Sequence, residues 1–459
     1  MFLIVSLWIG DIWGLIALLL FAFNSFSNEH ALFGDSHSSV IFFLIFGLFF
    51  LSIWLKKKSL WAILLTGFCF GTIPTLRYAE FLLLLVFALF IILHFQKSKT
   101  NYISLVVAGI GVGLPTVALA IRNQIAFGAF WKTGYGITDE PAHFGLSYFF
   151  QHFMPYIAQL LFHGVGILFI AGLIGAAILI RNKEFRLIGS FLLFLILPLT
   201  FLYMAYVWPP DPQSMRFLLP TFPIYIILSV WFLKIVSEKK AALGIISTIF
   251  IVFLTALAGL PRSFLSLKHL QSKHAVLANI THVIEENIQP GNILVANEGI
   301  IQNLDLLGKW KLSDINLLLP TSDKMLPIIP NNEMLRKRFR NAKALKKYSK
   351  LAEDKQSHAV SEDLWKWSER GRIYLLGKDE QVDSMKEKIM QTDSLVIVKR
   401  IDIPDIGKLQ FSGRNKRPYQ RSKFRMSRRK NITRRMKPNQ IYDFFVDGKP
   451  LFLVEWKRN

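Results

Sequence analysis

Long apolar runs alternate with short polar connections over the first 260 residues of the chain. A transmembrane helix needs roughly 20 successive apolar residues. Few soluble domains contain many runs of this length, so we predict a polytopic α-helical membrane domain over residues 1–260. Nine runs are candidate spans: 2–24, 39–55, 60–76, 78–95, 103–121, 156–180, 187–206, 217–236 and 241–260.

Beyond residue 260 the pattern changes to short segments typical of alternating helices and strands. A helical segment over 270–286 leads to a strand over 292–297. A second group follows, with a strand, a helix and a strand over 372–376, 379–391 and 394–398. Strands that alternate with helices indicate a parallel sheet. We therefore predict a soluble α/β domain over 261–410.

Two further segments follow this domain. Residues 411–440 contain twelve Lys or Arg and no acidic residue, which is typical of a flexible basic linker. Residues 441–459 contain the pair Asp447-Gly448 between two apolar segments. This pair favours the tight turn of a β-hairpin, so we expect a C-terminal hairpin after the linker.

Lys and Arg are concentrated in every second connection between the predicted spans, and this bias orients the chain. The basic connections, expected on the cytoplasmic side, are 56–58, 97–99, 181–186 and 239–240. The connections rich in Gly, Pro and aromatic residues then lie on the external side: 25–38, 77–78, 122–155 and 207–216. Nine spans also place the C-terminal domain on the external side.

Two of the external connections have distinctive sequences. The run Trp208-Pro209-Pro210-Asp211-Pro212 cannot form a continuous helix, because proline lacks an N–H donor and restricts the residue before it. Arg216 then opens the next span, where an arginine is costly unless it reaches the interface or an anion. In the connection 122–155, residues 146–156 have the pattern of an amphipathic segment lying on the membrane surface.

The net charge of +23 favours phosphate-bearing partners and anionic lipid surfaces. Arg77 and Arg216 are the candidate phosphate ligands, because a guanidinium group binds phosphate through two hydrogen bonds. A carboxylate beside such a site could act as general base on a hydroxyl group. The external loops supply the remaining candidates, which are Asp35 with His37, Lys132, Tyr135, Asp139 and Glu140.

Each candidate also has a purely structural interpretation. Arg77 and Arg216 could extend to the membrane surface without binding a ligand, and Glu80 could pair with Arg77 and have no other role. Acidic residues in loops are most often only solvated. These alternatives remain open at the level of the sequence.

Several classes of site are not indicated. Cys69 is the single cysteine, so the chain cannot form an internal disulfide or a cysteine-based metal site. No convincing metal-ligand spacing and no glycine-rich phosphate loop is present, so neither a metal nor a nucleotide cofactor is expected. The basic linker has few interleaved aromatic residues, so no nucleic-acid partner is expected.

Four motifs occur in a fixed order along the predicted membrane domain. Asp35 precedes an apolar run, and Gly67-Phe68-Cys69-Phe70-Gly71 leads to Leu76-Arg77-Tyr78. The connection after residue 122 reads Arg122-Asn123 and then Thr133-Gly134-Tyr135, and Arg216-Phe217-Leu218-Leu219-Pro220 opens a later span. This order resembles polytopic GT-C glycosyltransferases, specifically the bacterial branch similar to dolichyl-phosphate-mannose–protein mannosyltransferases and aminoarabinose lipid A transferases.

The resemblance implies a polyprenyl-phosphate sugar as donor, without a cofactor, and a glycan, lipid or protein hydroxyl as acceptor. It implies inversion at the anomeric carbon on the extracytoplasmic face of a bacterial inner membrane. Arg77 and Arg216 would then hold the donor phosphate. Lys132 and Tyr135, with the acidic residues Asp139 and Glu140, would shape the substrate pocket, and Asp35 is the best available carboxylate for catalysis.

One departure from the family pattern concerns the catalytic carboxylate. In GT-C enzymes of this kind it lies in a long external loop after the first span, ahead of the region that matches Met1 here. Asp35 fits the second external loop instead. The resemblance therefore implies that the chain is an N-terminally shortened member, that further residues belong before Met1, or that Asp35 has been recruited for catalysis.

Two other functions fit the same sequence. A transporter or flippase of an anionic lipid-linked substrate would use ionisable residues within the membrane and an internal repeat. A non-catalytic membrane scaffold would use its basic external domain to bind polyanionic glycans.

Overall fold

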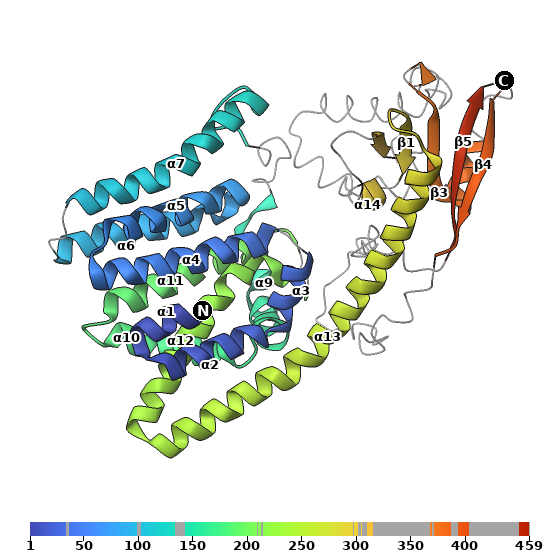
Figure 1. The fold of residues 1–459 in the computed structure, drawn as a ribbon. Helices are drawn as coiled ribbons and strands as arrows, with labels where there is room; N and C mark the ends of the chain where they lie inside the picture. Colours follow the sequence, from blue (N-terminus) through green and yellow to red (C-terminus); the bar gives the residue numbers. More distant parts are fainter. Residues whose placement is uncertain are drawn as a thin grey trace. The chain divides into compact units, whose positions relative to one another are not determined.

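The computed structural model describes residues 1–33, 36–98, 102–133, 143–208, 210–212, 214–296, 298–301, 304, 310–314, 368–369, 371–386, 393–403 and 449–458. The chain forms two compact units, Met1–Leu267 and Lys268–Asn459. The first unit is helical, and the second contains a small sheet (Figure 1).

The first unit consists of helices connected by short turns. The first seven helical segments are α1 (Phe2–Ile9), α2 (Asp11–Ala22), α3 (Ser25–Phe33), α4 (Ser36–Lys57), α5 (Leu60–Leu76), the 3-10 turn η1 (Tyr78–Glu80) and α6 (Phe81–Ser98). The others are α7 (Tyr102–Phe127), α9 (Leu146–Gln159), the π-helical η3 (Leu160–Gly164), α10 (Leu168–Arg181), α11 (Arg186–Met204), the 3-10 helix η4 (Ser214–Thr221), α12 (Phe222–Lys239) and α13 (Ala241–Asn287).

These helices have the length and surface of membrane helices. Among the described residues, six helices are long and apolar enough to cross a bilayer, or eight if each of two bent helix pairs counts as one span. One side of α7 is an uninterrupted apolar stripe whose side chains are each more than half exposed: Val106, Ile110, Leu114, Val117, Ile121 and Ile125. Such a surface suits lipid rather than water, which supports the predicted multi-pass membrane domain.

The predicted single span over 2–24 is wrong. Gly10 has a φ of 100° and separates α1 from α2. A Cβ atom built on Gly14 would lie 2.8 Å from the carbonyl oxygen of Phe2, although a continuous helix would place these residues about 18 Å apart. The segment is therefore a tight helical hairpin, and Gly10 permits its turn because glycine tolerates a positive φ.

The predicted span over 156–180 is also interrupted. The five-residue π-helix η3 and a turn at 165–167 separate α9 from α10. The segments Leu146–Gly164 and Leu168–Arg181 are inclined at 109°. The predicted amphipathic segment over 146–156 forms a helix, α9, whose exposed face carries Leu146, Phe150 and Met154.

Two other helices are longer than predicted. Helix α7 continues to Phe127, so Arg122 and Asn123 belong to its last turns and not to a loop. Helix α13 has 47 residues and joins the predicted span over 241–260 to the predicted helix over 270–286. Pro261 lies within it without ending it.

Helices α5 and α7 approach each other closely because glycines face one another across their interface. A Cβ atom on Gly67 would collide with the backbone carbonyl of Ala108, and one on Gly111 would collide with that of Leu64. A Cβ atom on Gly71 would lie 2.7 Å from the carbonyl oxygen of Val112. Small residues commonly permit this backbone contact between membrane helices.

We expect Gly111→Ala to lower the melting temperature of the detergent-solubilised protein. The added methyl group overpacks the α5–α7 interface, at a cost of about 1–3 kcal/mol. Gly113→Ala on the same helix is the matched control, since a Cβ atom there meets nothing within 4 Å. Alanine is favoured over glycine in helices, so the control should melt at the same or a higher temperature. Equal melting temperatures for the two variants would contradict this packing.

The second unit contains a five-stranded mixed sheet with the strand order β2-β1-β3-β5-β4. The strands are β1 (Ile293–Ala296), β2 (Lys311–Asp314), β3 (Ile373–Lys378), β4 (Asp393–Ile401) and β5 (Leu451–Arg458). The short helix α14 (Glu298–Ile301) follows β1, and α19 (Asp379–Lys386) follows β3. The end of α13 packs on one face of the sheet through residues such as Ile280 and Ile284, and α19 packs on the other through Val382 and Met385.

The parallel arrangement predicted for this sheet holds only for part of it. Strand β1 pairs in parallel with β2 and β3, whereas β5 lies between β3 and β4 and is antiparallel to both. Leu453 and Val454 are fully buried on opposite faces of β5, as expected for a central strand. The first half of the predicted hairpin and the basic linker 411–440 lie outside the described residues.

Candidate functional site

The candidate site lies within the first unit and is built around the turn between α5 and α6. Helix α5 ends at Leu76, where Arg77 adopts an extended backbone with φ −150° and ψ 117°. The 3-10 turn η1 then brings the chain directly into α6. This turn places Arg77 and Glu80 on the same side of the connection, three residues apart.

The Arg77 side chain binds three separate elements. Its Nε donates to Oε1 of Glu80 at 2.7 Å, and its Nη2 donates to the Tyr203 hydroxyl at 3.1 Å. Its Nη1 lies 2.9 Å from Nε2 of His37. Arg77 thus connects the α5–α6 turn to the first turn of α4 and to the last turn of α11.

Glu80 is completely buried, whereas the Arg77 side chain is 12% exposed. The Tyr203 hydroxyl also donates to Oε1 of Glu80, at 3.4 Å, and Oε2 has no hydrogen-bond partner among the described residues. A buried carboxylate is costly unless a cation neutralises it. The structure therefore contains the Arg77–Glu80 ion pair, which was the structural interpretation of Glu80 in the sequence analysis.

Phe217 forms an aromatic wall beside this ion pair. Its ring stacks on Tyr203 at a centroid distance of 4.8 Å and meets His37 edge-on at 5.8 Å. Two guanidinium groups approach the same ring, with the Cζ atoms of Arg77 and Arg216 at 5.9 and 5.1 Å from its centroid. We refer to His37, Arg77, Glu80, Tyr203 and Phe217 as the Arg77 cluster.

Arg216 differs from Arg77 in its surroundings. It lies in η4, is partly exposed, and forms no ion pair with a carboxylate within the described parts of the chain. Contact with the face of an aromatic ring is favourable but does not neutralise a cation. Arg216 thus adds a positive charge that the described residues leave uncompensated.

A second polar group lies next to the cluster along the chain. The Tyr78 hydroxyl donates to Oδ1 of Asn123 at 3.0 Å, and Nη1 of Arg122 donates to the Tyr78 hydroxyl at 3.2 Å. Nδ2 of Asn123 reaches the carbonyl of Phe130 in the turn after α7, at 3.5 Å. These contacts tie the end of α7 to the α5–α6 turn.

The loop before Arg216 is held by local hydrogen bonds. The backbone N–H of Ser214 donates to Oδ1 of Asp211 at 2.7 Å, and the N–H of Asp211 donates to Oγ of Ser214 at 3.0 Å. Farther back, the N–H of Val207 donates to the His143 carbonyl, and Gly145 donates to Ala205, both at 2.8 Å. The segment before α9 therefore lies against the loop that leads to Arg216.

All of these groups lie at one end of the helices. His37 is in the first turn of α4, Arg77 follows the last residue of α5, and Tyr203 is in the last turn of α11. Phe217 and Arg216 immediately precede α12. Consecutive antiparallel spans bring such termini to the same side, as the loop pattern predicted.

The structure describes only some of the candidate residues. Arg77 and Arg216 share the Phe217 ring, and Lys132 is exposed in the turn after α7. The other candidates, Asp35, Tyr135, Asp139 and Glu140, lie outside the described residues. Asp35 is separated from His37 by one residue in the sequence.

Sequence reasoning did not single out Tyr203, and it quoted Phe217 and Asn123 within motifs without assigning them a role. Tyr203 and Phe217 lie at the ends of apolar runs, where an aromatic residue is common at the membrane interface. In the sequence, the hydroxyl group distinguishes Tyr203 from its apolar neighbours, and the position next to Arg216 distinguishes Phe217. Within the described parts of the chain, no three His, Cys, Asp or Glu side chains form a group that could hold a metal ion.

Comparison of the chain with models of protein families found no match, and no curated protein matches it either.

We expect Arg77→Ala to lower the free energy of unfolding by about 3–5 kcal/mol, because Glu80 would remain as an unpaired buried charge. The measurement is denaturant unfolding in detergent micelles. Adding Glu80→Gln to Arg77→Ala should recover part of the loss, since the amide carries no charge. Arg122→Ala is the control, because Arg122 is exposed and contacts no carboxylate among the described residues. An equal loss in Arg77→Ala and Arg122→Ala would contradict the role of the buried pair.

Proposed function

We propose that the protein is a membrane glycosyltransferase of the GT-C kind. It transfers a sugar from a polyprenyl-phosphate donor to an acceptor hydroxyl group on the extracytoplasmic face of a bacterial inner membrane. The observation that carries the proposal is the position of Arg216 beside the Arg77 cluster. A cation without a described counter-charge lies where several apolar helices end, which suits a ligand with a lipid tail and a phosphate group.

The two arginines are proposed to have different roles. Arg77 already uses its Nε, Nη1 and Nη2 atoms within the Arg77 cluster, so we propose that it positions Tyr203 and Phe217. Within the described parts of the chain, the guanidinium group of Arg216 forms no hydrogen bond, so its N–H donors are available to a ligand. It is the better ligand for the donor phosphate, with Lys132 as a second cation at the same end.

The reaction proposed here is a single displacement. The acceptor oxygen attacks the anomeric carbon, and the bond from that carbon to the phosphate oxygen breaks with inversion. The hydroxyl proton passes to a carboxylate, and the electron pair of the broken bond stays on the lipid phosphate. Asp35 is the proposed base in this chain, and Tyr135, Asp139 and Glu140 are proposed to shape the pocket.

One observation favours a transporter as the second candidate. The break between α2 and α3 meets the break before α10, where Nδ2 of Asn24 donates to the Gly164 carbonyl at 3.1 Å. Broken helices that meet within a membrane domain are typical of transporter sites. The experiment below separates bond cleavage from movement of the substrate.

We expect Arg216→Ala to reduce sugar transfer by the intact protein about 100-fold, because the leaving phosphate would lose its cation. The assay supplies membranes with labelled polyprenyl-phosphate sugars and measures the release of free polyprenyl phosphate. Arg216→Lys should recover part of the activity, since lysine keeps the charge but not the two-pronged geometry.

Arg181→Ala is the matched control for this experiment. Arg181 is an exposed arginine at the last residue of α10, a helix that begins near Gly164 and runs to the opposite end of the unit. Its loss should leave transfer unchanged. Full activity of Arg216→Ala would remove the assigned role, and movement of intact donor across proteoliposomes without cleavage would establish the transporter instead.

A further inference from the structure

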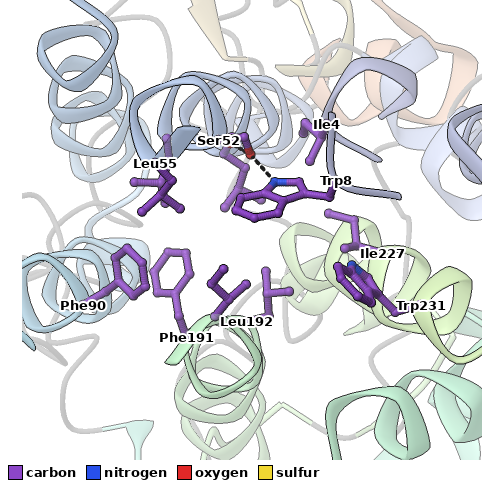
Figure 2. A pocket seen from close by; sticks show the side chains of 12 residues that line it. Ile4, Trp8, Ser52, Leu55, Phe90, Phe191, Leu192, Ile227 and Trp231 are labelled. Carbon is purple, nitrogen blue, oxygen red and sulfur yellow. Dashed lines mark hydrogen bonds between the residues drawn. The ribbon is translucent and has the colours of Figure 1, made fainter. Parts of the chain in front are cut away.

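A small apolar cavity lies far from the Arg77 cluster, between α1, α4, α6, α11 and α12 (Figure 2). Its volume is about 40 Å³. Aliphatic and aromatic side chains form nearly all of its lining, among them Ile4, Leu48, Leu55, Phe90, Leu192 and Ile227. Helix α4 contributes His37 to the Arg77 cluster and Leu48 and Leu55 to the cavity lining, so the two sites lie roughly 17–27 Å apart along that helix.

The polar atoms in the cavity wall already have partners. Nε1 of Trp8 donates to Oγ of Ser52 at 2.9 Å (Figure 2), and Ser52 Oγ donates to the Leu48 carbonyl at 2.7 Å. A buried water needs two to four polar partners, and these bonds leave few. The cavity is thus suited to hydrocarbon, and the bond to Ser52 holds the Trp8 indole as its wall.

Each of the two tryptophans in the wall is covered by a lysine. The Lys56 Nζ lies 5.3 Å from the centroid of the Trp8 ring and also donates to the Leu7 carbonyl. The Lys234 Nζ lies 5.6 Å from the centroid of the Trp231 ring and 3.0 Å from Oε1 of Glu238. Two ammonium groups therefore lie beside an apolar cavity at the level where the helices end.

The charges around this end favour an anion. Basic residues at the same helix ends outnumber the acidic residues Asp11, Glu184 and Glu238; they are Lys56, Lys57, Lys58, Arg181, Lys183, Arg186, Lys234, Lys239 and Lys240. An apolar cavity under tryptophan and lysine side chains has the chemistry of a phospholipid site, with hydrocarbon inside and phosphate at the surface.

We propose that this cavity binds an anionic glycerophospholipid of the surrounding bilayer. Part of one acyl chain enters the cavity, and the phosphate lies between Lys56 and Lys234. The bound lipid contacts α1, α4 and α12, which all contribute to the cavity lining. This site is separate from the proposed donor site and does not depend on the glycosyltransferase proposal.

The test uses the intact protein in detergent, with phosphatidylglycerol or phosphatidylcholine of identical acyl chains added in turn. We expect phosphatidylglycerol to raise the melting temperature more than phosphatidylcholine, because a ligand that binds only the folded state stabilises it. Phosphatidylglycerol brominated on its acyl chains should quench tryptophan fluorescence. Trp8→Phe should reduce that quenching, since Trp8 lines the cavity.

The variant Lys56→Gln with Lys234→Gln should weaken phosphatidylglycerol binding by about fivefold per lysine. Lys57→Gln with Lys240→Gln is the matched control, because it removes the same charge from exposed neighbours of the two lysines. A second variant, Leu192→Phe, partly fills the cavity and should reduce quenching by the brominated phosphatidylglycerol while both lysines remain. It keeps the test valid if the lysine variant fails to fold.

Two results would overturn the proposal. Equal stabilisation by phosphatidylglycerol and phosphatidylcholine would show that the phosphate charge is not recognised. Equal affinities of the lysine variant and its control would show that Lys56 and Lys234 do not bind the headgroup.

Discussion

A buried ion pair between Arg77 and Glu80 joins several helix ends of the first unit. Glu80 is a fully buried carboxylate, and Arg77 neutralises it while also contacting His37 and Tyr203. These contacts join the α5–α6 turn to α4 and α11, and Phe217 adds the entry to α12. Because a buried charge without its partner is strongly destabilising, the positions of these helix ends are set together. The geometry of the Arg77 cluster therefore depends on the Arg77–Glu80 pair.

The same constraint separates two kinds of arginine that look alike in the sequence. Arg77 serves the fold because its donors are taken by neighbouring side chains. Arg216 follows a local turn held by Asp211 and Ser214 and meets only an aromatic ring among the described residues. Arg77 is neutralised by Glu80, whereas Arg216 lies beside the same ring without a described counter-charge. The proposed function rests on this difference between the two arginines.

Much of the architecture could be predicted because hydrophobic length is a strong signal. Helix α5 has the bounds predicted for the apolar segment 60–76, although it is shorter than the candidate spans, and the order of helices and strands follows the pattern of the chain. The breaks were harder to predict, because a single residue such as Gly10 reverses the chain inside an apolar run. The position of β5 between β3 and β4 depends on strands distant in sequence, so the local pattern did not indicate it. For the site, Arg77 and Arg216 could be named, but their partners Tyr203 and Phe217 could not, since aromatic residues are common at span ends.

The sequence by itself determined that the chain forms apolar helices followed by a small α/β unit, and that its loop arginines lie at one end of those helices. These properties follow from composition and periodicity, which act along the chain. Only the tertiary structure decided which arginine is neutralised, where glycines bring α5 against α7, and which tryptophans and lysines surround a cavity. Those outcomes depend on contacts between residues that are far apart in the sequence, where a distance of a few ångströms decides whether a charge is paired or available.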